Sequence, residues 1–214
     1  MLENLKREVL KASLTLSKYG LVTYAGGAAS ACESRYGLVV INPSGVPFED
    51  LKAEDLLVLD MDGNVLEGES DPAPEIKTHL EIYKAFTGVS GVVNTVSPYA
   101  VAWAQAKRDI PCYGAIHAKR FYGAVPCTRL LKKEELSDFE KNTGKVIAET
   151  FKSRALDPAA VPAVLCAGYA PFCWGKTVGE AAVNAATLED AAKAAVLTEK
   201  IDPNTAPFSN MKKA

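Results

Sequence analysis

Residues 89–107, VSGVVNTVSPYAVAWAQAK, predict a buried strand that leads directly into a helix. All of this stretch except Lys107 belongs to an uncharged run, 88–106, that approaches membrane-spanning length. Asn94 and Pro98 interrupt that run, and such breaks argue against a transmembrane helix. They favour a buried strand over 89–98, followed by a helix with Pro98 near its start.

A second uncharged run, residues 158–175, is broken by proline and glycine in the same way. Its centre, VPAVLCAG at 161–168, predicts another buried strand rather than a transmembrane segment. Apolar spacing and capping signals predict further helices over 2–18, 75–86, 132–151 (with a mild interruption at Gly144) and 177–200.

Short apolar segments between these helices predict strands and hairpins without a strict strand–helix alternation. They are a strand at 21–30 running into a small-residue loop, a strand at 37–46 ending in a Pro-Ser-Gly turn, a hairpin at 55–68, and loop and strand at 110–127. This mixture favours one mixed α/β (α+β) domain over residues 1–201, with a largely antiparallel central sheet flanked by helices. Residues 202–214 are expected to form a short, frayed tail.

The composition excludes several functions before any motif is considered. The 214 residues carry a net charge of −2 and no basic block, so no nucleic-acid partner is expected. No segment predicts a membrane span or a signal peptide, so we expect a cytoplasmic protein without a membrane partner. The five widely spaced cysteines form no CxxC pair, and two histidines, His79 and His117, are too few for a three-histidine metal site.

Several motifs occur in an order that indicates a family. They are LVTYAGGAAS (21–30), VVINPSGV (39–46), the Pro-Glu and Thr-His pairs within 74–79, VVNTVSP (92–98), IHAKRFYGAVPCTR (116–129), NTGKVIAETF (142–151), and APFCWGK (170–176) with the alanine-rich helix after it. In this order the chain resembles the class II aldolase/adducin family, and within it the L-ribulose-5-phosphate 4-epimerase branch, from residue 1 to about 200. The resemblance implies the fold of that family and a homotetramer whose active sites lie between neighbouring subunits.

The resemblance also implies a divalent metal, usually zinc, held by an HxH motif on a strand and by a third histidine before Gly-Pro-Phe. In this sequence the HxH positions read Asn94-Thr95-Val96, and the third position is Tyr169. Valine offers no lone pair, asparagine is a weak oxygen ligand, and tyrosine would have to ionise. We therefore expect no metal bound in the family manner, and no cofactor.

The phosphate site that the resemblance implies is depleted too. The family's Gly-Asn loop, Lys-Pro-Ser-Gly turn and Ser-Ser pair become Gly27-Ala28, Asn42-Pro43-Ser44-Gly45 and Ala73-Pro74. One lysine and three hydrogen-bonding side chains are missing, and each bond to a charged group contributes about 1.5–3 kcal/mol. We expect a small, non-phosphorylated ligand, although the 42–45 stretch also fits a simple tight turn. The candidate binding residues are Gly27, Ala28, Asn42, Ser44, Gly45 and Asn94.

Four residues are candidates for catalysis, and each has a simpler alternative. Glu75 falls where the aldolase branch has its catalytic glutamate, so it would act as a base or merely complement a helix N-terminus. Lys119 stands where epimerases have a catalytic aspartate, and would be an electrostatic substitute, a Schiff-base amine or a solvated charge. Tyr169 would donate a hydrogen bond into the cavity or fill space. His117 would assist as an electrophilic partner, although it and His79 match family histidines that are not ligands, so hydrogen-bonded buried or half-buried histidines are expected.

Three functions stay open from the sequence. The first is a repurposed lyase- or epimerase-like enzyme, whose cavity takes a small non-phosphorylated carbonyl or acid compound without metal. The second is a non-catalytic binding or scaffolding protein of the same fold. The third is an aldehyde-lyase or sugar-phosphate epimerase that binds metal through other ligands, such as Glu75 and His117. The joint loss of metal and phosphate ligands favours the first two.

Overall fold

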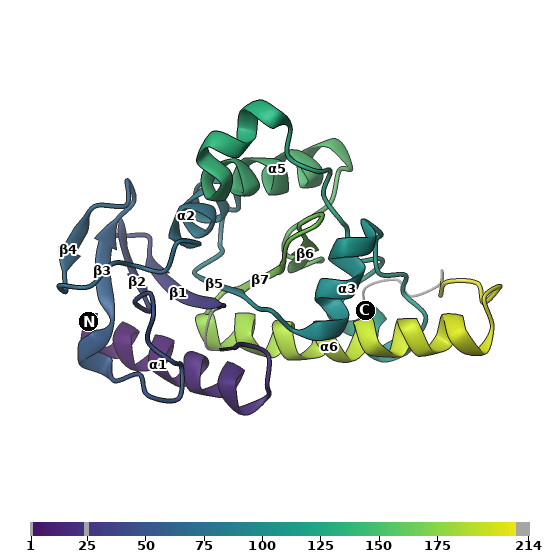
Figure 1. Cartoon of the computed structure of the whole chain (residues 1–214), viewed down its shortest axis with the longest axis horizontal. Coiled ribbons are helices and arrows are strands. Elements are labelled where there is room, and N and C mark those ends of the chain that lie inside the picture. The colour runs from purple at the N-terminus through teal and green to yellow at the C-terminus, as the bar shows by residue number, and fades with distance from the viewer. Residues whose placement is uncertain (1, 24–25, 209–214) are drawn as a thin grey trace.

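The computed structural model describes residues 2–23 and 26–208, which form one sheet with helices on both faces (Figure 1). Within these residues the sheet has seven strands in the order β4-β3-β2-β1-β5-β7-β6, and neighbouring strands pair antiparallel throughout. The strand bounds are β1 Ala28–Glu33, β2 Leu38–Ile41, β3 Leu57–Asp60, β4 Val65–Glu67, β5 Gly91–Asn94, β6 Ala163–Leu165 and β7 Pro171–Gly175. The predicted mixed α/β class with a largely antiparallel sheet is therefore confirmed.

Helices cover the two faces of the sheet unequally. The α-helices are α1 Leu2–Lys18, α2 Ile76–Ala85, α3 Pro98–Ala106, α4 Ala115–Phe121, α5 Phe139–Ser153 and α6 Val178–Ile201, with short 3-10 helices at Ala53–Asp55 and Lys133–Asp138. One apolar cluster joins α1, α3 and α6 to the sheet, and a second joins α2 and α5 to its other face. None of the described helices combines the length and apolar composition needed to cross a bilayer.

Strand β5 separates the two clusters residue by residue. Val93 packs in the cluster of α1 and α6, and Val92 packs in the cluster of α2 and α5. Because side chains two residues apart on a strand point to the same face, Asn94 shares the side of Val92. The end of β5 thus brings a polar side chain to the face that α2 covers.

Helix α2 is held against α5 by a close approach at Gly144. A Cβ atom at that position would lie 2.5 Å from Cβ of Glu81 and 3.0 Å from the carbonyl oxygen of Thr78, both on α2. Any larger residue would push the two helices apart. The glycine that the sequence pattern treats as a mild interruption of a helix is therefore a packing contact, and it fixes the helix that carries Glu75 at its start.

Two predicted segments are wrong. In 21–30 the small-residue loop precedes the strand, because β1 begins only at Ala28, after Gly27 with a φ of +121° that no strand uses. In 110–127 the structure has the helix α4, which is too short for helical periodicity to show. Gly114 and the left-handed Tyr122 bound that helix.

Strand β7, Pro171–Gly175, was not predicted, and the other predicted elements agree with the structure with shifted ends. Helix α5 begins at Phe139, because residues 133–138 form a 3-10 helix instead. Thr177 caps α6 as predicted, with its hydroxyl accepting from the Glu180 amide at 3.1 Å, but the carboxylate of Glu180 accepts from the amide of Lys176. Of the predicted tail, residues 202–208 contain neither helix nor strand, and residues 209–214 lie outside the described residues.

Candidate functional site

A cavity of about 310 Å³ opens where β1 begins, β2 ends and α2 begins. Its walls come from the loop before β1, the turn after β2 and the segment that leads into α2. The lining residues are Thr23, Gly26, Gly27, Asn42, Pro43, Ser44, Gly45, Val46, Phe48, Ala73, Pro74 and Glu75. Five sequence-predicted site residues, namely Gly27, Asn42, Ser44, Gly45 and Glu75, are thus brought to one place.

The turn after β2 shapes one wall through its backbone. The side-chain oxygen of Asn42 accepts from the Ala29 amide at 2.9 Å, and its side-chain nitrogen donates to the Pro43 carbonyl at 3.1 Å. Asn42 is therefore a structural residue of the turn, since both ends of its buried amide are engaged. Ser44 and Gly45 are exposed at the rim, where they remain accessible to a ligand.

Glu75 and Tyr169 meet beside the cavity. Glu75 is the residue immediately before α2 and is half-buried, and the Tyr169 hydroxyl donates to its Oε1 at 3.3 Å. The pKa of Tyr169 is raised, first by burial and then by the Glu75 charge, so the phenol keeps its proton. The Tyr169 ring is held by Phe139 at a centroid distance of 5.0 Å. The pair combines a carboxylate with a protonated hydroxyl, which is a possible base and its positioning donor.

Below this pair, α2 presents a buried polar stripe to the sheet. Glu75, His79 and Tyr83 follow one another at four-residue spacing and therefore lie on one face of the helix. Nδ1 of His79 lies 2.7 Å from the Ser30 hydroxyl, which in turn lies 2.8 Å from the Tyr83 hydroxyl. Burial lowers the pKa of His79 to about 3, so the ring is neutral. Sequence reasoning missed Ser30 and Tyr83, although the helical spacing of Tyr83 was a usable signal.

Asn94 completes the stripe from the sheet. It is 1% exposed and stands between Ala28 and Phe172 in the strand register. Asn94 lies close enough to His79 to raise its pKa against the larger effect of burial. Their contact nevertheless does not meet hydrogen-bond geometry, so Nε2 of His79 and Oδ1 of Asn94 are both buried without a partner among the described residues. Ala28 is fully buried in β1 and does not line the cavity, so it serves as packing.

The other two predicted catalytic residues lie on α4, which packs against α6. His117 is buried and bonds through Nε2 to the Gly123 carbonyl at 2.7 Å, and Lys119 is exposed. Burial lowers the pKa of His117, which agrees with a neutral ring that donates to this carbonyl. Within the described part of one chain, no hydrogen bond or ion pair joins either residue to Glu75.

The side chains at the positions that the sequence resemblance assigns to metal ligands do not fit a zinc ion. Val96 has no donor atom, Asn94 offers only an amide, and the raised pKa of Tyr169 disfavours the phenolate that a metal would need. Over residues 2–23 and 26–208, no three His, Cys, Asp or Glu side chains gather closely enough to hold a metal ion.

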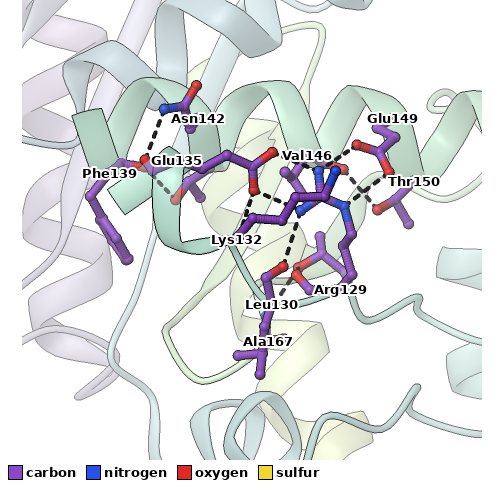
Figure 2. A network of polar contacts seen from close by, with 12 residues as sticks. Arg129, Leu130, Lys132, Glu135, Phe139, Asn142, Val146, Glu149, Thr150 and Ala167 are labelled. Carbon is purple, nitrogen blue, oxygen red and sulfur yellow. Dashed lines mark hydrogen bonds and ion pairs between the residues drawn. The ribbon is translucent and has the colours of Figure 1, made fainter. Parts of the chain in front are cut away.

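Arg129 and its partners form a second polar cluster, in which the guanidinium is fully paired (Figure 2). The Arg129 guanidinium donates to both carboxylate oxygens of Glu135 at 2.7 and 2.8 Å, to both of Glu149 at 3.0 and 2.7 Å, and to the Leu130 carbonyl at 3.1 Å. It borders a smaller cavity of about 160 Å³, which Tyr169 also lines. With its donors engaged, Arg129 holds the loop after α4 to α5 and offers no free charge to a ligand.

Comparison with known proteins agrees with this architecture. The family described as Class II Aldolase and Adducin N-terminal domain matches residues 7–196. Among solved structures, the chain is similar to an L-fuculose 1-phosphate aldolase, with 23% identity over 97% of this chain and 91% of that chain and a TM-score of 0.80. It is also similar to a putative aldolase/epimerase/decarboxylase from Escherichia coli (22%, 97% and 95%, TM-score 0.76) and to an L-fuculose-1-phosphate aldolase from Thermus thermophilus (21%, 96% and 100%, TM-score 0.73). At these identities the structural likenesses establish the fold.

Proposed function

Since this chain belongs to the class II aldolase and adducin family, we propose that it is a divergent member whose cavity beside Glu75 takes a small non-phosphorylated carbonyl compound without a family-type zinc site. The observation that carries the proposal is the half-buried Glu75 carboxylate at the cavity wall, held by the protonated hydroxyl of Tyr169. A positioned carboxylate of this kind can remove a proton next to a carbonyl group.

The charge of the cavity supports a ligand without phosphate. Glu75 is the only charged side chain among the described residues that line it. A phosphate dianion would meet a carboxylate there without a cation to offset the repulsion. The exposed Ser44 and Gly45 supply neutral hydrogen-bonding groups at the rim, which suit hydroxyl and carbonyl oxygens. For the same reason a neutral carbonyl compound is favoured over a carboxylic acid.

The proposed chemistry is a proton transfer to Glu75. Tyr169 holds Oε1, which leaves Oε2 of Glu75 to accept a proton from the carbon next to the carbonyl of the ligand. As the carbon–hydrogen bond breaks, its electron pair moves toward the carbonyl oxygen. Tyr169 retains its own proton, because its pKa is raised, and acts only by orienting the carboxylate.

Assembly of several chains would add the α4 residues to this site. We propose the homotetramer that the family resemblance implies, with His117 and Lys119 of one chain facing the cavity of a neighbour. The exposure of Lys119 and of Ile116, whose surface is 78% accessible, supports an interface on α4. The molar mass measured by light scattering tests the stoichiometry.

Hydrogen–deuterium exchange tests the chemistry. Purified protein is incubated with dihydroxyacetone in heavy water, and loss of the α-proton signal is followed by proton NMR. We expect enzyme-dependent exchange that Glu75→Gln abolishes, while Glu54→Gln, the same change at an exposed position, leaves it intact. Dihydroxyacetone phosphate is expected to exchange more slowly than dihydroxyacetone.

The alternatives give different results in the same assay. Exchange that persists in Glu75→Gln contradicts the role of Glu75. Exchange that a chelator abolishes and zinc restores supports an enzyme with unexpected metal ligands. Binding of dihydroxyacetone without exchange supports the non-catalytic function.

A further inference from the structure

The polar stripe under α2 contains two buried atoms whose chemistry is complementary. Nε2 of His79 and Oδ1 of Asn94 belong to side chains that are 0% and 1% exposed, and neither atom has a hydrogen-bond partner among the described residues. The two side chains are neighbours, since the His79 ring packs edge-on against Phe172 at a centroid distance of 5.9 Å, and Phe172 is the strand partner of Asn94. An amide oxygen can only accept, so the pair is satisfied when Nε2 carries the proton.

The other side of the imidazole agrees with this assignment. Nδ1 of His79 lies 2.7 Å from the Ser30 hydroxyl, which donates to Nδ1 when that nitrogen is unprotonated. The Tyr83 hydroxyl donates to the Ser30 carbonyl at 3.0 Å and lies 2.8 Å from the Ser30 hydroxyl, so it does not need the Ser30 proton. A chain of donors then runs from the Ser30 hydroxyl through His79 to Asn94, while the Tyr83 hydroxyl donates to the Ser30 backbone carbonyl.

The alternative tautomer would reverse the chain. If Nδ1 carried the proton, it would donate to Ser30, and Nε2 would need a donor from Asn94. Oδ1 of Asn94 would then have to turn away from His79, and the amide would present an acceptor instead of its N–H groups. The tautomer of His79 therefore determines whether the Asn94 amide presents N–H donors or an oxygen acceptor on the side away from His79.

The backbone of Asn94 lies next to the cavity wall, although its side chain does not line the cavity. Asn94 pairs with Ala28 in the register of β1 and β5, and a Cβ atom at Gly27 would lie 3.4 Å from the backbone carbonyl oxygen of Asn94. Gly27 lines the cavity that ends at Glu75. An amide with its oxygen turned to His79 has only N–H groups left for a ligand.

We propose that His79 is a positioning residue which, as the neutral Nε2–H tautomer, fixes Asn94 as a hydrogen-bond donor for a carbonyl oxygen of the ligand. For its ligand the inference rests on the proposed function, but the orientation of Asn94 does not. The donor would supply part of the electrostatic stabilisation that a developing oxyanion needs, next to the base Glu75.

The tautomer is measured on the intact chain. Long-range proton–nitrogen correlation of the ¹⁵N-labelled protein at pH 7 distinguishes the protonated from the bare ring nitrogen. The protein has only two histidines, so His117→Gln leaves one signal to assign, and backbone connectivities assign it if that variant does not fold. We expect protonated Nε2 and bare Nδ1 at His79. The Nδ1–H tautomer, or a doubly protonated ring, overturns the inference whatever the ligand does.

Ser30→Ala tests the coupling behind this tautomer. The variant removes the hydroxyl that satisfies Nδ1, so a mixture of both tautomers is expected. An unchanged, pure Nε2–H signal would show that Asn94 alone fixes the ring, which still supports the pairing of His79 with Asn94. A complete change to Nδ1–H would contradict that pairing.

Binding of dihydroxyacetone tests the donor role. Asn94→Asp replaces the N–H groups by an oxygen of the same size, and we expect at least a tenfold weaker affinity by calorimetry with the His79 tautomer unchanged. Asn4→Asp is the matched control, because it makes the same change at an exposed position on α1. Equal affinity in Asn94→Asp and wild type overturns the donor role. If the wild type does not bind dihydroxyacetone, the proposed function fails, and the tautomer still decides the orientation of Asn94.

Discussion

Two polar clusters share Tyr169 as a neighbour and differ in how fully their atoms are paired. In the Arg129 cluster, formed by Arg129, Glu135 and Glu149, the guanidinium donates to four carboxylate oxygens and one carbonyl (Figure 2). In the cavity cluster, formed by Glu75, His79 and Asn94 with the residues that touch them, two buried atoms lack a partner and one carboxylate oxygen has no bond among the described residues. The Arg129 cluster holds segments of the chain together. The cavity cluster instead has hydrogen-bonding atoms that are not yet used, beside the cavity that Glu75 lines.

The difference suggests how to separate structure from function in this chain. A satisfied ion-pair network is explained by the segments it joins, here the loop after α4 and α5. A buried polar atom without a partner costs stability, so we infer that Nε2 of His79 and Oδ1 of Asn94 pair with each other and leave the Asn94 N–H groups for a ligand. Variants of the residues in and around the two clusters test this contrast.

The largest change should come from rebuilding a metal site in the cavity cluster. Asn94→His, Val96→His and Tyr169→His together place three imidazoles at the positions that the family resemblance assigns to zinc ligands, near Glu75. We expect zinc binding with a Kd of about 1 μM or tighter, which corresponds to about −8 kcal/mol. Calorimetry with zinc measures it, and the wild type is the control. A folded triple variant that takes up no zinc would refute the superposition of this chain on the family.

The alignment of this sequence with the family motifs predicted part of the site. It placed Glu75 and Tyr169 in one site, although 94 residues separate them, and the structure joins them at 3.3 Å. It did not predict the contacts of Ser30 with His79 and with Tyr83, because those depend on how α2 is rotated over the sheet. Helix α4 was missed for a related reason, since seven residues carry too little periodicity to separate a helix from a strand.

The second prediction concerns the stability of the folded protein at low pH, which the buried His79 should reduce. The pKa of His79 falls from 6.5 in the unfolded chain to about 3 in the folded one, so the unfolded state binds the extra proton between these values. As far as His79 is concerned, the free energy of unfolding therefore has its full value above pH 6.5. It decreases as the pH falls below 6.5, by up to about 1.4 kcal/mol per pH unit. Between pH 6.5 and 4.5 the loss should be roughly 2–3 kcal/mol.

Urea unfolding at several pH values measures this loss. His79→Gln removes the titrating group, so its stability should change less over the same range, although it is less stable at pH 7. The exposed carboxylates are common to both proteins and cancel in the difference. Parallel pH profiles for the two proteins would show that His79 is not the neutral buried group described above.

A third effect should come from the helix contact that positions the cavity cluster. Gly144→Ala places a Cβ atom 2.5 Å from Glu81 and forces α2 from α5, which we expect to cost about 1–3 kcal/mol. Gly179→Ala is the matched control, because the nearest atom there is 3.8 Å away, and its effect should be close to zero or slightly stabilising. Equal stabilities of the two variants, measured by urea unfolding, would contradict the tight contact.

The smallest effect should come from the Arg129 cluster. Arg129→Met removes a guanidinium whose side chain is 32% exposed, and ion pairs of that kind contribute little net stability because water competes with both partners. We expect the Tm to fall by about 2–4 °C. Arg129 holds the pKa of Glu135 at about 2, so the variant should raise that pKa toward 4.5, which carboxyl NMR measures.

The same variant decides whether the two clusters are independent. Tyr169 lines the cavity that Arg129 borders, yet its hydroxyl contacts Glu75 and its ring contacts Phe139. If Arg129 acts only by joining segments, Arg129→Met should leave the His79 tautomer and the dihydroxyacetone affinity as in the wild type. A twofold or larger loss of affinity would mean that the paired cluster positions Tyr169, and the division between a structural and a functional cluster would then have to be given up.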